Sequence, residues 1–317
     1  MLNNIPKTIL SSLLKTKNIK QIINSKYNLI KYNFKNYPIF ILDNLIIKNK
    51  DKIYEISNLD FKKEYKVCIA CLSKFKNNID SNPEKLINSV INSINFQDTF
   101  IVLRIDKSDC ILYYKLLFRK YSKKINMCII IGADCRSRND FPSFWEDTFK
   151  KLSKVKFIWY QFTSDDSYFA NKNWIQELHQ INRKEEVFMV SDVKLKYPCE
   201  AWYLDDNGNQ IYINQPPTVN YPAIKSKVLN FLLQKYPNEP LFGPNMSADT
   251  YLGMIFGDSP NYFYLDSYII RSKQLNSFVN SKKENLFRKK ALLENSTEEY
   301  RSKGIIILKS LVEEFLS

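Results

Sequence analysis

Short apolar runs alternate with helical patterns through the middle of this chain. Residues 127–131 and 155–162 are apolar and rich in branched or aromatic side chains, which is typical of strands buried on both faces of a parallel sheet. Residues 144–152 and 173–181 have the spacing of helices that cover such a sheet. The pattern therefore predicts an α/β fold with a mostly parallel sheet flanked by helices.

Helical spacing also recurs in the two terminal segments. The apolar positions are Ile5, Ile9, Leu10, Leu13 and Leu14 at one end and, after a capping box at Ser296 and Glu299, Ile305, Leu308, Leu311, Val312 and Phe315 at the other. Stripes of this kind usually pack on the rest of the protein, so we expect both helices to do so. The alternatives are a membrane-surface helix at the N-terminus and a homodimer contact at the C-terminus.

Membrane insertion is not expected from the apolar pattern. No apolar run approaches the ~20 residues that span a bilayer, and Asp43 interrupts the best candidate at 37–47. The N-terminal segment lacks the small-residue cleavage site of a signal peptide. We therefore expect a cytoplasmic protein, with peripheral contact to a membrane as the alternative.

Charged side chains follow the ends of two predicted strands. Arg136 and Arg138 come after the first strand, and Asp165 and Asp166 close the second. Ligands of open α/β sheets bind at such strand ends, and adjacent carboxylates suit Mg²⁺ or Mn²⁺, which take oxygen ligands and neutralise a departing diphosphate. The alternative is a plain turn in which an Asp caps the helix beginning near Asn173.

A series of motifs extends this pattern along the chain. They are the strand-like segment 66–71, the helix-like segment 83–94, the strand-like segment 99–106 with Ser108 and Asp109, the Arg-Ser-Arg-Asn segment 136–139, the segment 156–166, Ala248-Asp249, and the closing segment 264–277. In this order they resemble family 2 of the GT-A glycosyltransferases, over about residues 65–278. The resemblance implies a GT-A fold, with an accessory segment at 1–62, a catalytic domain at 63–280 and a helical tail at 281–317.

The same resemblance implies an inverting, metal-assisted sugar transfer, as in polysaccharide biosynthesis. The donor is a nucleotide sugar, and the acceptor is a glycan, lipid-linked or protein hydroxyl. Asp249 would be the catalytic base, and Asp165 and Asp166 would hold Mn²⁺ or Mg²⁺, with Asp165 also close to the nucleotide. The remaining nucleotide contacts would be Asp106, Asp109, Arg136 and Arg138, and Arg271 would lie on the acceptor side.

The chain departs from the family pattern in three places. Thr163 stands where the family often has the first Asp of its metal motif, and Ala248 replaces the Glu before the base. Ser272 and Lys273 follow Arg271 where a His is frequent. Metal binding would then depend on the two remaining carboxylates alone.

An acceptor region is expected between the metal motif and the base. Strand patterns at 200–204 and 210–213 flank Asn207-Gly208, and Asn-Gly between alternating strands predicts a hairpin. Trp202 and Tyr203 on this hairpin are either stacking surfaces for a sugar ring or ordinary cross-strand packing residues, which is the commoner use of hairpin aromatics.

The composition argues against nucleic-acid binding and against glycine-rich phosphate-binding loops. The net charge of +14 invites a nucleic-acid partner, but the lysines are spread over the chain rather than clustered, so we expect none. The six glycines are too scattered for a Walker or Rossmann phosphate loop. Two alternatives stay open: a nucleotidyltransferase, which would lack its usual glycine-rich loop after the first strand, and an inactive nucleotide- or glycan-binding module.

The cysteines and the single histidine suggest no further chemistry. Cys68 and Cys71 form a C-x-x-C, but residues three apart in a strand point to opposite faces, so we expect these thiols to diverge. His179 has no second candidate ligand near it in the sequence. We expect buried, reduced cysteines and a structural histidine.

Overall fold

The computed structural model describes residues 55–73, 83–134, 141–192, 199–215, 219, 221–237, 248–257, 259–265, 269–271 and 297–317. The predicted N-terminal helix lies outside this part of the chain, as do Ser296, Arg136 and Arg138.

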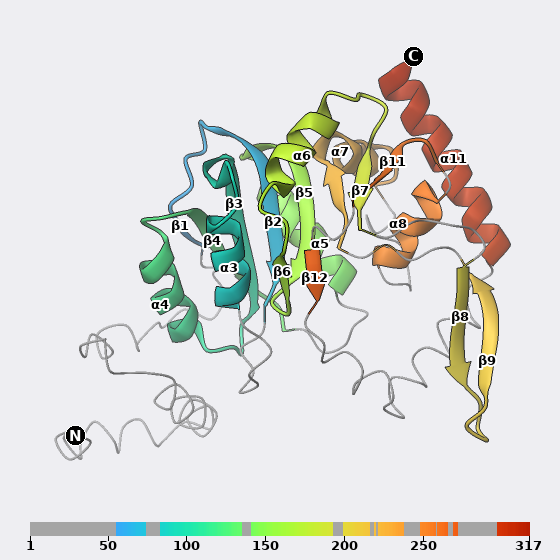
Figure 1. The fold of residues 1–317 in the computed structure, drawn as a ribbon, viewed down its shortest axis with the longest axis horizontal. Coiled ribbons are helices and arrows are strands. Elements are labelled where there is room, and N and C mark those ends of the chain that lie inside the picture. Colours follow the sequence, from blue (N-terminus) through green and yellow to red (C-terminus); the bar gives the residue numbers. More distant parts are fainter. Residues whose placement is uncertain are drawn as a thin grey trace.

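An eight-stranded sheet forms the centre of the protein (Figure 1). Its order is β1 (Glu55–Ser57), β4 (Asn126–Gly132), β3 (Thr99–Asp106), β2 (Glu64–Leu72), β5 (Lys156–Ser164), β10 (Ala223–Lys225), β7 (Met189–Ser191) and β11 (Tyr262–Tyr264). All of these strands run in one direction except β1 and β10, which pair antiparallel with their neighbours. The predicted α/β fold with a mostly parallel sheet is confirmed. The edge strand β1 comes from the segment that the sequence assigns to the N-terminal accessory part.

Helices cover both faces of this sheet. One face carries α3 (Pro83–Ile91), α4 (Ile111–Tyr121) and α6 (Trp174–Asn182), and the other carries α5 (Phe141–Lys151), α7 (Ser226–Lys235), α8 (Ala248–Phe256) and α11 (Thr297–Leu316). Side chains of β2 alternate between the two layers, so Cys68 and Cys71 are buried in different cores, as predicted. None of the helices in the described part of the chain is long and apolar enough to cross a bilayer.

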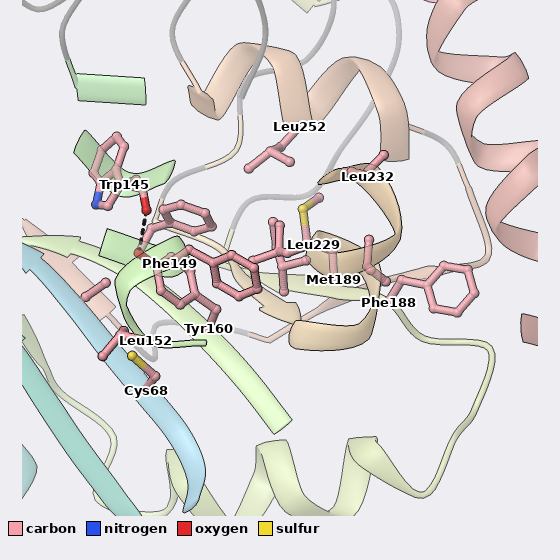
Figure 2. Close-up of a cluster of buried hydrophobic side chains, with 14 of the residues drawn as sticks. Cys68, Trp145, Phe149, Leu152, Tyr160, Phe188, Met189, Leu229, Leu232 and Leu252 are labelled. Atoms are coloured by element: carbon pink, nitrogen blue, oxygen red, sulfur yellow. Dashed lines mark hydrogen bonds between the residues drawn. The ribbon is translucent and has the colours of Figure 1, made fainter. Parts of the chain in front are cut away.

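Figure 2 shows the core between the sheet and the second helical layer. Tyr160 of β5 lies edge-to-face against Phe149 of α5, and Leu229 and Leu252 bring α7 and α8 into the same cluster. The Tyr160 hydroxyl donates a hydrogen bond of 2.9 Å to the Trp145 carbonyl, which satisfies its one polar atom. Because each large apolar side chain buried in this way contributes about 2 kcal/mol, the cluster holds α5, α7 and α8 firmly on the sheet.

The C-terminal helix α11 packs on its own chain, as predicted. Ile307 and Leu311 are buried in the same core, and Leu308, Val312 and Phe315 pack against it. The prediction was wrong for Ile305, which is 59% exposed. The buried stripe runs through Ile307 instead, because the backbone at Gly304 packs closely against Met254 of α8 and so fixes which face of α11 is buried.

We predict that Gly304→Ala lowers the free energy of unfolding by about 1–2 kcal/mol, although Ala favours helices more than Gly. A Cβ at this position would lie 2.6 Å from the Met254 carbonyl oxygen, which belongs to backbone and cannot rotate away. Urea unfolding of the variant measures the loss. Ser302→Ala, at an exposed position of the same helix, is the control and should be neutral. Equal stability of the Gly304→Ala variant and the wild type would contradict the close contact.

Two further sheets of two strands each are found in the described part of the chain. β8 (Cys199–Leu204) and β9 (Gln210–Gln215) form the predicted hairpin, with Gly208 at φ 83° in its turn. That φ suits glycine, which has no Cβ to clash. The second sheet pairs β6 (Ser167–Phe169) with β12 (Ile269–Arg271). A 3-10 turn, Phe96–Asp98, precedes β3.

A buried lysine closes the end of β10. Lys225 is 4% exposed and its Nζ donates a hydrogen bond of 3.0 Å to the Lys184 carbonyl. Burial, helped by the nearby charge of Lys227, lowers the pKa of Lys225 to about 8. Burying the charged ammonium group therefore lowers the stability of the folded protein, and this loss of stability disappears when Lys225 is deprotonated.

We predict that the free energy of unfolding of the wild type rises relative to that of Lys225→Met between pH 7 and pH 10. Over this range the folded protein loses the Lys225 proton while the unfolded chain still holds it, so raising the pH favours the folded state. The difference should grow by about 2 kcal/mol. Urea unfolding of both proteins at pH 7 and pH 10 measures it, and parallel pH profiles would show that Lys225 is not buried as a cation.

Candidate functional site

The order in which the chain adds strands to the sheet reverses at β2. Strands β2, β3 and β4 follow one another outward, and β5 then pairs with the opposite side of β2. The carboxyl ends of β2 and β5 therefore flank a topological switch point, which is where open α/β sheets bind ligands. Ser73 follows β2, and Asp165 and Asp166 follow β5. The predicted carboxylates thus lie where the topology favours a ligand.

The alternative interpretation of the two carboxylates is partly right. Asp165 and Asp166 form a turn between β5 and β6. They do not cap the next helix, because α6 begins at Trp174, and the backbone N–H of Asn173 bonds Asn171 at 2.8 Å. Both carboxylates are partly exposed, so the turn presents them at the edge of the sheet.

A chain of hydrogen bonds joins Asp165 to Asp109. Ser73 Oγ donates to Asp165 Oδ2 at 2.9 Å and lies 2.9 Å from the Tyr114 hydroxyl. Since Ser73 has one hydroxyl proton, the Tyr114 hydroxyl donates to Ser73, and it shares its proton with Asp109 Oδ2 at 3.4 Å. Two carboxylates that the sequence assigns to the nucleotide are therefore linked through buried hydroxyls, one from Ser73 directly after β2 and one from Tyr114 of α4.

Tyr114 stays a neutral donor in this chain of hydrogen bonds. Burial and then the charge of Asp109 raise the pKa of Tyr114 well above its usual value. The Cys71 thiol below the turn behaves in the same way: burial raises its pKa, and Asp165 and Asp166 add to the shift. Neither group offers a reactive anion, so the negative charge of this region is carried by the carboxylates.

The ends of β3 and β4 are held by a buried arginine. Arg104 is 3% exposed, donates to the Ala133 carbonyl at 2.8 Å, and lies over the ring of Phe144 at 4.4 Å. Its Nη1 is 3.9 Å from Asp106 Oδ1. A Cβ on Gly132 would lie 2.5 Å from the Arg104 guanidinium, so only glycine leaves room for it. Asp106 itself is 4% exposed and is covered largely by the protein.

Asp166 is held by two hydroxyls on one of its oxygens. The Tyr221 hydroxyl donates to Asp166 Oδ1 at 3.0 Å, and Ser164 Oγ donates to the same oxygen and also lies within hydrogen-bond distance of the Tyr221 hydroxyl. No donor to Asp166 Oδ2 is found within the described ranges. The carboxylate is therefore oriented through one oxygen, which leaves the other for a ligand.

Tyr221 adopts a backbone conformation that bulky residues avoid. Its φ is 41°, in the left-handed region, which costs an L-residue about 1–2 kcal/mol. The fully buried Gln161 donates from Nε2 to the Tyr221 carbonyl at 2.6 Å, and the Phe162 N–H bonds the Pro222 carbonyl at 3.0 Å. These contacts with β5 fix the strained residue beside the carboxylate turn.

Two more residues of the predicted motifs lie next to this turn. Thr163 is fully buried and bonds Ser167, which in turn donates to the Ser164 carbonyl at 2.7 Å. It therefore braces the turn instead of supplying a ligand. Arg271, in the closing motif, pairs with Ser167 in the register of β12 and β6. Its backbone is thus brought next to Asp166 from a distant part of the sequence.

The other predicted residues belong to other elements or fall outside the described residues. Asp249 is in the first turn of α8, and Trp202 and Tyr203 are on β8 of the hairpin, where Trp202 is opposite Tyr212. Arg136 and Arg138 follow β4 and fall outside the described residues. An Asp in the first turn of a helix also has a structural use, since it complements the helix dipole.

The site offers two carboxylates to a divalent cation, and water or the phosphate oxygens of a substrate would complete the coordination. No group of three or more metal-binding side chains is found within the described ranges. Asp165 and Asp166 are adjacent carboxylates, and Mg²⁺ sites commonly combine one or two carboxylates with phosphate oxygens and water. The residues present therefore fit a cation that arrives with a diphosphate.

Sequence reasoning missed the residues that hold the carboxylates. Ser73 could have been found from the sequence, because it comes just after a predicted strand that ends at the same edge of the sheet. Tyr114 and Tyr221 gave no signal, since one is an ordinary helical aromatic and the other is brought in by the antiparallel strand β10.

The fold and the site define an α/β protein with a carboxylate-lined switch point. No family model matches the chain, and no curated protein matches it. Among solved structures, S. aureus TarS residues 1–349 is similar at 12% identity over 72% of this chain and 69% of that one, with a TM-score of 0.44. The same protein in complex with UDP-GlcNAc gives 12% identity, 72% and 71% coverage, and a TM-score of 0.40.

A 4-diphosphocytidyl-2C-methyl-D-erythritol synthase from Anaerococcus prevotii is similar at 14% identity over 72% of this chain and 99% of that one, with a TM-score of 0.39. Likenesses at this level assign no activity, which has to be argued from the site.

Proposed function

We propose that this protein is an inverting GT-A glycosyltransferase that moves a sugar from a nucleoside-diphosphate sugar to an acceptor hydroxyl. The observation that carries the proposal is the position of Asp165 and Asp166 at the switch point, where Asp165 is linked to Asp109 by hydrogen bonds through Ser73 and Tyr114. The resemblance of the motifs to family 2 supports the same reading. The acceptor class is a glycan, a lipid-linked glycan or a protein.

The donor would be held by the ends of β2, β3 and β5. Asp109 is partly exposed at the start of α4 and would accept hydrogen bonds from the base or ribose, with Asp106 behind it. Arg136 and Arg138 would contact the base or the phosphates, for which a planar guanidinium is well suited. Asp165 and Asp166 would hold Mn²⁺ or Mg²⁺, which neutralises the diphosphate as it leaves.

The transfer itself would be a single displacement. The acceptor oxygen attacks the anomeric carbon from the side opposite the diphosphate, and the bond between that carbon and the phosphate oxygen breaks. Asp249 would take the proton of the acceptor hydroxyl, which requires only hydrogen-bond reach. Trp202 and Tyr203 on the hairpin and Arg271 on β12 would contact the acceptor.

Ligand-induced stabilisation tests this proposal. Thermal unfolding is measured with UDP-, GDP-, CMP- and dTDP-sugars, each with and without Mn²⁺. A ligand that binds only the folded state raises the melting temperature by mass action, so a metal-dependent rise with one nucleotide is the expected result. Release of that nucleoside diphosphate on addition of acceptor glycans would then demonstrate transfer.

The alternatives give different results in the same assay. A nucleotidyltransferase would be stabilised by a nucleoside triphosphate with Mg²⁺ and would release pyrophosphate. An inactive module would bind a nucleotide or glycan without turnover, and the replacement of the motif carboxylate by the buried Thr163 is the feature that favours it. No stabilisation by any nucleotide would contradict the glycosyltransferase.

A further inference from the structure

The carboxylate turn has a support that the family motifs do not include. Tyr221 comes from the segment before β10, far from Asp166 in sequence, and both Tyr221 and Ser164 bond the same oxygen of Asp166. Hydroxyls that bond both oxygens would compete with a ligand. Here the second oxygen has no donor from any described residue.

The position of Tyr221 is itself fixed by the sheet. Its side chain is 8% exposed, its φ is 41°, and its carbonyl accepts a hydrogen bond from the fully buried Gln161. A strained residue persists only where the surroundings determine its conformation. The Tyr221 hydroxyl is therefore delivered to Asp166 by β5 and β10 together, with little freedom to move.

We propose that Tyr221 and Ser164 are positioning residues that hold Asp166 so that Oδ2 alone faces a divalent cation. This inference depends on the proposed function, because it assumes that Asp166 is a cation ligand. Residues that hydrogen-bond a ligating carboxylate set its direction, and their loss typically lowers metal affinity about 10- to 100-fold. Tyr221 itself would touch neither the cation nor the substrate.

Binding of Mn²⁺ alone to the full chain, followed by the electron paramagnetic resonance signal of free Mn²⁺, tests this role without any turnover. We expect Tyr221→Phe to weaken Mn²⁺ binding about 10-fold. Ser164→Ala should weaken it in the same direction, which keeps the test valid if one variant fails to fold. Asp166→Asn should abolish binding.

Tyr160→Phe is the matched control. Tyr160 is also buried and donates one hydrogen bond, 2.9 Å long, to a carbonyl. Tyr160→Phe therefore removes the same hydroxyl as Tyr221→Phe, at a comparable cost in stability. Tyr160 nevertheless lies in the core between the sheet and α5 (Figure 2). Its Mn²⁺ affinity should equal that of the wild type.

The outcomes separate the inference from the proposed function. Unchanged Mn²⁺ affinity in Tyr221→Phe and Ser164→Ala, with loss in Asp166→Asn, would overturn the positioning role and leave the cation site standing. Equal weakening in Tyr160→Phe would also overturn it, because the effect would then be one of stability. Absence of Mn²⁺ binding by the wild type would overturn the positioning role, while the nucleotide-sugar assay with and without Mn²⁺ would still decide whether the donor binds and whether a cation binds together with it.

Discussion

Replacing Asp249 with Asn should reduce sugar transfer about 10³- to 10⁴-fold while nucleotide-sugar binding stays unchanged. An amide of the same shape cannot take the proton of the acceptor hydroxyl, and general-base catalysis contributes up to about that factor. The comparison requires two measurements on the variant: the rate of nucleoside-diphosphate release with acceptor present, and the thermal stabilisation by the donor.

The control must account for the position of Asp249 in the first turn of α8. An acid there also stabilises the helix through its dipole, by about 0.3–1 kcal/mol. Glu299→Gln makes the equivalent change in the first turn of α11, at an exposed position, and should leave transfer intact. Retained turnover in Asp249→Asn would remove Asp249 from the role of base.

Replacing Asp166 with Asn should remove the Mn²⁺-dependent part of donor binding and lower transfer by about 10³-fold or more. A neutral amide is a poor ligand for Mn²⁺ or Mg²⁺, which prefer charged oxygens, and the diphosphate would then leave without its counter-charge. The hydroxyls of Tyr221 and Ser164 donate to Asp166 and would still find an acceptor in the Asn carbonyl. The fold should therefore survive.

Asp60→Asn is the control for this change. Asp60 is an exposed carboxylate in a turn and accepts the backbone N–H of Lys62 at 2.9 Å. It precedes β2 and so lies at the edge of the sheet opposite the candidate site. The same Mn²⁺-dependent rise in melting temperature with the donor, in the wild type and in Asp166→Asn, would show that Asp166 does not hold the cation.

The sequence was a good guide to the strands that build the switch point. Apolar runs at 127–131 and 155–162 correspond to β4 and β5, and the motif segment 99–106 corresponds to β3. These strands are buried on both faces, so their composition is constrained by the core and gives a clear signal. Once they are placed in parallel, the carboxyl-end residues must share one edge of the sheet.

The support of the site could not be predicted, because it depends on pairings between distant segments. Tyr221 reaches Asp166 only because β10 runs antiparallel beside β5, and Arg271 reaches Ser167 only through the short pairing of β12 with β6. β10 and β12 are three residues long, too short to give a periodic pattern. Ile305 was misplaced for a related reason, since the contact of Gly304 with α8 fixes the rotation of α11.

The direction of β10 decides at which edge the chain re-enters the sheet. Because β10 is antiparallel to both β5 and β7, the chain leaves the sheet after β7 and re-enters it before β10 at the same edge, the edge that carries Asp165 and Asp166. The excursion between them contains the hairpin β8–β9 (Figure 1). Both of its attachment points therefore lie at the edge that carries the carboxylates. Replacing this segment would change what is presented to the candidate site without altering the order of the strands in the sheet.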